Sequence, residues 1–214
     1  MPSGGGDYFG DMGNRGSAQR TVIAVARRAW RALGRLLRAW RGRPGPSLDV
    51  GLPQWAEVDK RRRAHIRRVA ALVERWAEEM EVPKRERARW LRAVWLHDAL
   101  RDARLPKGTT HGAAAADRAA RQGESDAGVL DAVRYHSIGY AGWDAAGRML
   151  YLADYLEPGR RGRRKTRARL AERVPRDPDR VLREVVKQQI RGRLRAGRTI
   201  HPLTLEFWNS LDGD

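Results

Sequence analysis

The chain has 214 residues and no cysteine, which excludes disulfide frameworks and thiolate metal sites, so any bound metal must be held by nitrogen and oxygen ligands. Hydrophobic residues make up 41% and charged residues 33% of the chain, as is typical of a globular protein. The net charge of +18 favours a polyanionic partner, although a chain rich in arginine, alanine and glycine is also what a GC-rich genome encodes.

The N-terminal 47 residues differ from the rest of the chain. Residues 1–20 are glycine-rich and are predicted to be disordered, with no apolar core of a secretory signal. Residues 21–41 predict a basic amphipathic helix, followed by a linker at 42–47. This helix could lie in an anionic membrane interface, but we favour a helix docked on the domain, because an apolar stripe at helical spacing is usually buried.

Residues 48–214 predict one all-α domain, because strand patterns are almost absent. Apolar residues recur at steps of three and four, which predicts helices at 55–81, 84–101, 111–122, 126–137, 144–156, 163–174, 178–196 and 203–211. No run approaches the roughly 18–20 apolar residues of a membrane span. We therefore expect a cytoplasmic protein, with peripheral membrane contact left open by the basic helix.

Two aspartates stand in apolar surroundings within predicted helices. Asp98 follows the apolar run 93–96, and Asp154 lies in the segment MLYLADYL. A carboxylate is costly to bury unless it is paired or binds a cation. A single histidine on a helix is usually an ordinary core or surface side chain, but four of the five histidines here accompany these aspartates: His65, His97, His111 and His136.

The adjacent pair His97–Asp98 suits a site with two metal ions. On a helix, neighbouring side chains diverge by about 100°, so one could bind a first ion while the other bridges to a second. Imidazole and carboxylate ligands suit iron, manganese, zinc and similar ions. Two ions about 3.5–4 Å apart can hold the attacking and leaving oxygens of a phosphoryl displacement.

The order of these residues resembles the HD superfamily of metal-dependent phosphohydrolases, and within it the bacterial YqeK-like symmetrical diadenosine tetraphosphate hydrolases. The resemblance covers about residues 55–211 and implies an HD-type helical bundle with a basic N-terminal extension. It rests on the segments RRAHIRRV (62–69), LHD (96–98), HGAAAA (111–116), AVRYHSIG (132–139), YLADYLEPGR (151–160) and IHPLTLE (200–206).

The resemblance also implies roles for individual residues. One metal ion would be held by His65, His97, Asp98 and Asp154, with Asp98 bridging, and the second would be completed by His111 and His136. The family suggests two iron ions, divalent or of mixed valence, with manganese or another first-row metal as alternatives. Water held between the ions would attack phosphorus and release two ADP. Arg101 would assist catalysis and bind substrate, together with Ser137 and Arg160.

Two other functions stay open. Only twelve residues separate Asp98 from His111, which is shorter than in the family, so the substrate could be another nucleotide. The chain could instead be a basic HD scaffold that binds nucleic acid or a membrane surface through residues 21–41 and 160–169. His201 lies outside the ligand pattern, and we expect it to be structural or close to the substrate.

Overall fold

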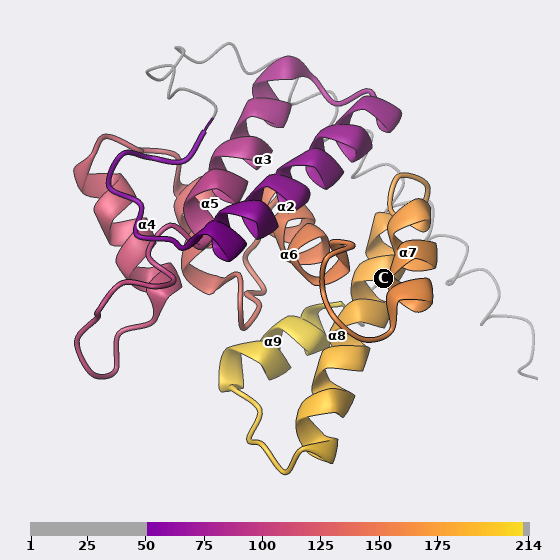
Figure 1. Ribbon diagram of the computed structural model, residues 1–214. Coiled ribbons are helices and arrows are strands. Elements are labelled where there is room, and N and C mark those ends of the chain that lie inside the picture. Colours follow the sequence, from indigo (N-terminus) through magenta and orange to yellow (C-terminus); the bar gives the residue numbers. More distant parts are fainter. Residues whose placement is uncertain (1–50, 212–214) are drawn as a thin grey trace, which may run out of the picture. The chain divides into compact units, whose positions relative to one another are not determined.

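The computed structural model describes residues 51–211 (Figure 1). The predicted disordered segment 1–20 and the basic helix and linker at 21–47 lie outside these residues, so they stay predictions. The described part contains eight helices and no strand, which confirms the all-α prediction: α2 (Lys60–Glu79), α3 (Lys84–His97), α4 (His111–Arg121), α5 (Ala127–Tyr135), α6 (Ala145–Leu156), α7 (Arg164–Arg173), α8 (Pro178–Arg195) and α9 (Pro202–Ser210).

Side-chain caps encoded in the sequence fix where four of these helices begin. Asp59, Thr110, Asp126 and Asp144 each stand just before a helix and accept a hydrogen bond from a backbone N–H of its first turn. Such a cap satisfies an amide that has no partner within the helix. His201 caps α9 in the same way, through a bond from the Leu203 amide, which gives this histidine a structural role.

Helix α6 lies in the middle of the domain, against α2, α3, α5, α7 and α8 (Figure 1). Its apolar residues are almost all buried, among them Leu150, Leu152 and Leu156. Burial of this apolar surface is the main force that holds the bundle together. Among the described helices, none is both long and apolar enough to cross a bilayer.

Arg89 on α3 ties together the beginnings of two other helices. Its guanidinium bonds to Asp126 at 2.6 and 2.8 Å and to Asp144 at 2.6 Å, and these two aspartates are the caps of α5 and α6. A third carboxylate, Glu86, lies 2.9 Å away on the same helix as Arg89. The hydrogen bond to Asp126, helped by the other two carboxylates, raises the pKa of Arg89 despite partial burial. One cation therefore positions α5 and α6 on α3.

Helix α3 ends at His97, four residues earlier than the periodicity predicts. The chain turns at Asp98 and then pairs with the segment before α2: the Glu57 amide donates to the Ala99 carbonyl, and the Asp102 amide donates to the Glu57 carbonyl. These tertiary bonds take backbone groups that a longer helix would use internally. The sequence analysis placed Arg101 on this helix. It lies instead in the turn that follows α3.

Candidate metal centre

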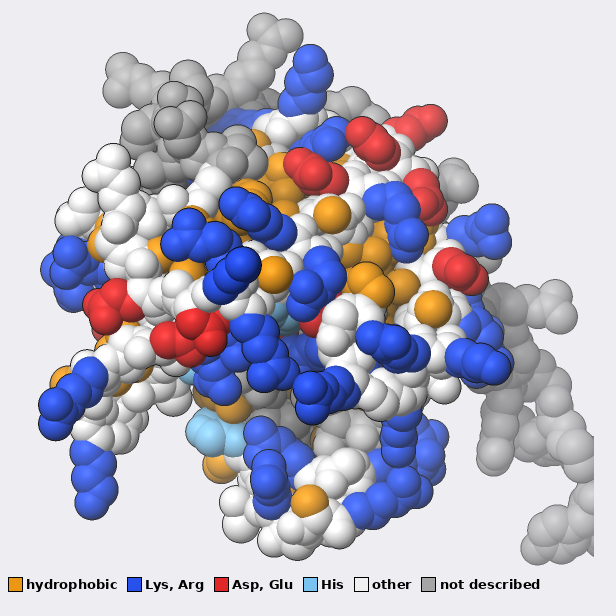
Figure 2. All heavy atoms as spheres, viewed as in Figure 1, with side chains coloured by type: hydrophobic (Ala, Val, Ile, Leu, Met, Phe, Trp, Pro, Cys, Tyr) orange, Lys and Arg blue, Asp and Glu red, His pale blue; other side chains and the backbone are white. Residues whose placement is uncertain are grey.

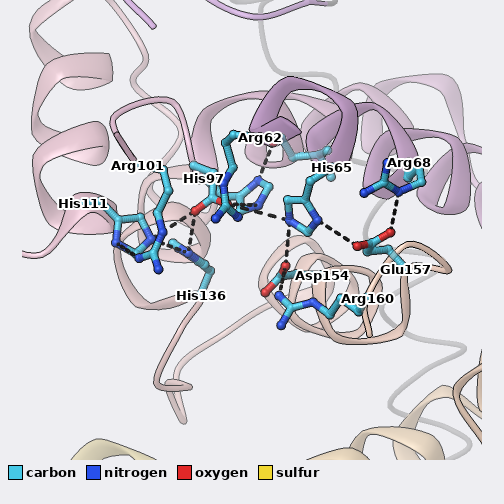
Figure 3. Close-up of polar contacts among 12 residues, drawn as sticks. Arg62, His65, Arg68, His97, Arg101, His111, His136, Asp154, Glu157 and Arg160 are labelled. Atoms are coloured by element: carbon cyan, nitrogen blue, oxygen red, sulfur yellow. Dashed lines mark hydrogen bonds and ion pairs between the residues drawn. The ribbon is translucent and has the colours of Figure 1, made fainter. Parts of the chain in front are cut away.

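Six side chains from five helices and their ends converge on one place in the domain (Figure 3). They are the six ligands predicted from the sequence, and they fall into two groups of three: His65, His97 and Asp154, and Asp98, His111 and His136. Within each group, nitrogen or oxygen atoms that could bind a metal lie within 4.8 Å of one another. The fold thus brings together residues that are up to 89 positions apart in the sequence.

Asp98 lies between the two groups. Its Oδ1 atom is 3.1 Å from Nε2 of His111 and 3.6 Å from Nε2 of His136, both in the second group. Its Oδ2 atom is 3.5 Å from Nε2 of His97 and 3.7 Å from Nε2 of His65, both in the first group. Each oxygen of the carboxylate therefore faces a different set of imidazoles, which is the arrangement that a bridging ligand requires.

Helix ends orient two of the imidazoles. His97 is the last residue of α3, and its Nδ1 donates to the Val94 carbonyl at 2.6 Å. His136 follows α5, and its Nδ1 donates to the Val133 carbonyl at 2.7 Å. Carbonyls in the last turn of a helix lack a partner within the helix, so a histidine placed there can use one of them. The bond fixes the proton on Nδ1 and leaves the Nε2 lone pair facing the centre.

His65 is oriented by a buried carboxylate that the sequence prediction missed. Its Nδ1 lies 3.1 Å from Oε1 of Glu157, whose other oxygen accepts bonds from Arg68 at 2.7 Å and the Gly159 amide at 2.6 Å. Burial alone would raise the pKa of Glu157, but His65 and Arg68 lower it to about 2. Glu157 is therefore ionised and can hold the His65 ring in place.

The unpartnered nitrogens of the site fit a metal. Nε2 of His97 is completely buried and has no hydrogen-bond partner, and Nε2 of His65 also has none, although it lies 3.0 Å from Oδ1 of Asp154. A buried polar atom without a partner is costly, and a cation would supply one. Burial lowers the pKa of His97 to about 4, which keeps the ring neutral, as a metal ligand must be.

Asp98 is also held in its ligand form. Burial on its own would raise its pKa, but the histidines around it, His97 above all, keep the pKa well below the usual range. Arg62 adds a 2.6 Å ion pair to Oδ2. This arginine was not predicted, yet it stands three residues before His65 on α2 and so lies on the same helix face. The same spacing from Asp154 could have pointed to Glu157.

The three predicted substrate-binding residues are placed differently around the centre. Arg101 is exposed, and its Nη1 lies 3.0 Å from Nδ1 of His111. Arg160 forms an ion pair with the Asp154 carboxylate, beside the first group. Ser137 is exposed in the turn that follows α5. Two of the three are thus adjacent to predicted ligands, one beside each group.

We expect Glu157→Gln to weaken metal binding about 10- to 100-fold, because the loss of a partner that orients a ligand typically has an effect of this size. The substitution removes the charge that fixes the His65 tautomer but keeps the size of the side chain. Titration of the metal-free protein with Mn²⁺, followed by calorimetry, measures the affinity. Glu172→Gln, at an exposed site on α7, is the matched control. Equal affinities of the two variants would show that Glu157 does not support the site.

Comparison with known proteins agrees with this geometry. Residues 62–159 match the model of the HD domain family, a range that includes all six predicted ligands. The fold is similar to the crystal structure of a predicted HD superfamily hydrolase involved in NAD metabolism from Clostridium acetobutylicum, with a TM-score of 0.61 and 21% identity over 72% of this chain and 90% of that one. No curated protein sequence matches the chain significantly. Residues 62–159 are therefore similar to the HD domain family, and the described part of the chain shares the fold of an HD superfamily hydrolase.

Proposed function

We propose that the protein hydrolyses a nucleotide polyphosphate at a site with two metal ions, and that its substrate is diadenosine tetraphosphate, cleaved symmetrically to two ADP. The observation that supports this proposal most directly is the position of Asp98, whose two oxygens face two separate groups of ligands. A site for a single ion would not need a carboxylate shared in this way. Phosphoryl transfer is the chemistry to which a bridged pair of ions is best suited.

In this proposal, His65, His97 and Asp154 hold one ion, His111 and His136 hold the other, and Asp98 bridges them. We propose iron, with manganese or another first-row metal as the alternative, because all the donors are imidazole nitrogens and carboxylate oxygens. When bound, such a pair of ions lowers the pKa of water and neutralises negative charge that develops on phosphate.

Arginines next to the ligands would bind the phosphates. Arg101 is exposed beside His111, and Arg160 lies beside Asp154. Figure 2 shows lysine and arginine side chains over much of the face that is drawn, with histidine side chains among them. A guanidinium binds two phosphate oxygens at once, so these residues would orient the polyphosphate and offset its charge. We propose Ser137 as an additional phosphate contact from the turn after α5.

The basic run at 160–169 divides into inward and outward residues. Arg167 donates to the carbonyls of residues 160, 161 and 162 and lies over the Tyr155 ring, so it holds the loop before α7 in place. The exposed members of the run are Arg161, Arg163, Arg164, Lys165 and Arg169. Together with the predicted helix at 21–41, they are our proposed contact with an anionic membrane surface or nucleic acid.

Metal analysis and a substrate panel test the proposed function. The purified full chain is expected to contain about two first-row metal ions and to convert diadenosine tetraphosphate to ADP as the only product. Chelation should abolish hydrolysis, and iron or manganese should restore it. The panel includes ATP, ADP, mononucleotides and NAD. Absence of stoichiometric metal would contradict the enzyme class, whereas AMP and ATP as products, or activity on mononucleotides alone, would contradict the symmetrical cleavage.

A further inference from the structure

A cavity of about 340 Å³ is lined by chain segments that follow two of the candidate ligands, Asp98 and His111. Its walls come from three parts of the chain: residues 55–57 before α2, residues 100–109 after α3, and one face of α4. The second wall begins two residues after Asp98, and the third belongs to the helix that starts with His111. The cavity is thus built on the two elements that supply ligands on either side of the short segment 99–110.

The lining combines a flat apolar wall with unpaired positive charge. Trp55 is half-buried against the core and forms the wall together with leucine and proline side chains. Arg104, Arg118 and Arg121 also line the cavity, and within residues 51–211 none of the three forms an ion pair with a carboxylate. Of the two acidic side chains in the lining, Asp117 is already paired with Arg134 at 2.6 Å. The cavity therefore offers an aromatic face and an excess of guanidinium groups.

Helix geometry sets the distance from the cavity to the ligands. Arg118 is seven residues after His111, so the two side chains lie on the same face of α4, about 10 Å apart along its axis. A ligand with a phosphate at the metal centre and further groups extending along α4 would reach Arg118. This is the shape of a nucleotide whose phosphate chain leads away from the reacting phosphorus.

We propose that this cavity binds a nucleoside phosphate end of the substrate, with the base against Trp55 and phosphate oxygens on Arg118 and Arg104. The inference rests on the proposed function and adds the residues that select a nucleotide over other polyphosphates. Every base has a π face that can stack on an indole ring, and a guanidinium group binds phosphate through two parallel hydrogen bonds. The short segment 99–110 is then a wall of the nucleotide site.

Binding of two probes to the metal-loaded full chain tests the inference. ADP carries a base, whereas inorganic tripolyphosphate does not, and both are titrated by calorimetry. Trp55→Leu is expected to weaken ADP about tenfold, the loss typical of one stacked base, and to leave tripolyphosphate unchanged. Arg118→Gln should weaken both probes. Trp55→Phe, which keeps a ring, should restore most of the ADP affinity, and thermal melting of each variant verifies that it is folded.

Arg180→Gln is the matched control, because Arg180 is an exposed arginine on α8 outside the cavity. Its ADP affinity should equal that of the wild-type protein.

Two results would overturn the inference. One is an unchanged ADP affinity in both Trp55→Leu and Arg118→Gln; the other is ADP that binds at the cavity but does not compete with diadenosine tetraphosphate. In turnover, the two variants should raise KM about tenfold with kcat within twofold. A chain that hydrolyses no nucleotide, yet binds ADP through Trp55, would refute the proposed function while leaving the nucleotide site in place.

Discussion

Asp98→Ala is expected to reduce hydrolysis at least about 10³-fold and to lower the metal content from two ions to one or none. The reason is that both oxygens of this carboxylate are used, one toward each group of imidazoles. In the proposed two-ion site, loss of the bridging ligand would remove charge stabilisation worth several kcal/mol in the transition state, and each 1.36 kcal/mol corresponds to a factor of ten. Metal analysis and initial rates on diadenosine tetraphosphate measure the two effects.

Two further variants make this result interpretable. Asp98→Asn keeps the shape of the side chain and should still lose both metal and activity, because an amide is a poor bridging ligand. Asp131→Ala removes a half-buried carboxylate of α5 that lies outside the site, and it should retain both. If Asp98→Ala held two ions and turned over normally, the shared-carboxylate model of the centre would be wrong.

Arg89→Met is expected to lower the free energy of unfolding by about 3 kcal/mol, the lower end of the range for breaking a buried ion pair. The arginine side chain is only 15% exposed and bonds to three carboxylates, two of which cap α5 and α6. Methionine fills similar space but leaves these carboxylates without their cation. Urea unfolding, followed by circular dichroism, gives the stability of each protein.

Arg87→Met is the matched control on the same helix. Arg87 pairs with Glu78 at 3.5 Å, and the Glu78 side chain is 68% exposed, so the expected loss is below about 0.5 kcal/mol. The two substitutions remove the same charge from α3 and differ in burial and in the number of partners. Similar losses for both would mean that Arg89 does not organise the helix starts.

The ion pairs of Arg89 should also make the stability of the folded protein depend on pH. Burial alone would raise the pKa of Asp126, but the bonds from Arg89 outweigh it and lower that pKa. A carboxyl group whose pKa is lower in the folded state contributes stability that is present above its unfolded pKa of about 3.9 and is lost as the pH falls through the folded value. The wild-type protein should therefore lose more stability than Arg89→Met on acidification below about pH 4.

Local rules made most of the fold predictable from the sequence. The periodic apolar residues gave eight helices within residues 51–211, and capping side chains such as Asp59 and Asp144 mark where helices begin. The two largest errors were helix ends: the pattern began the first helix at residue 55, five residues before Lys60, and extended α3 to residue 101, four residues beyond His97. That helix ends at His97 because the segment around Glu57 takes the Ala99 carbonyl and the Asp102 amide, and no local pattern encodes a bond across 42 residues.

The sequence by itself determined the chemistry of this protein: no thiolate, six imidazole and carboxylate side chains in a recognisable order, and abundant guanidinium groups around them. The resemblance already named Asp98 as the bridging residue. Only the tertiary structure showed that its two oxygens face different groups of imidazoles, that Glu157 and Arg62 support the ligands, and that the short segment after Asp98 lines a cavity with Trp55. The reason is physical. Ligand type and helical spacing are properties of neighbouring residues, whereas bridging, orientation and cavity shape depend on distances between helices that only packing sets.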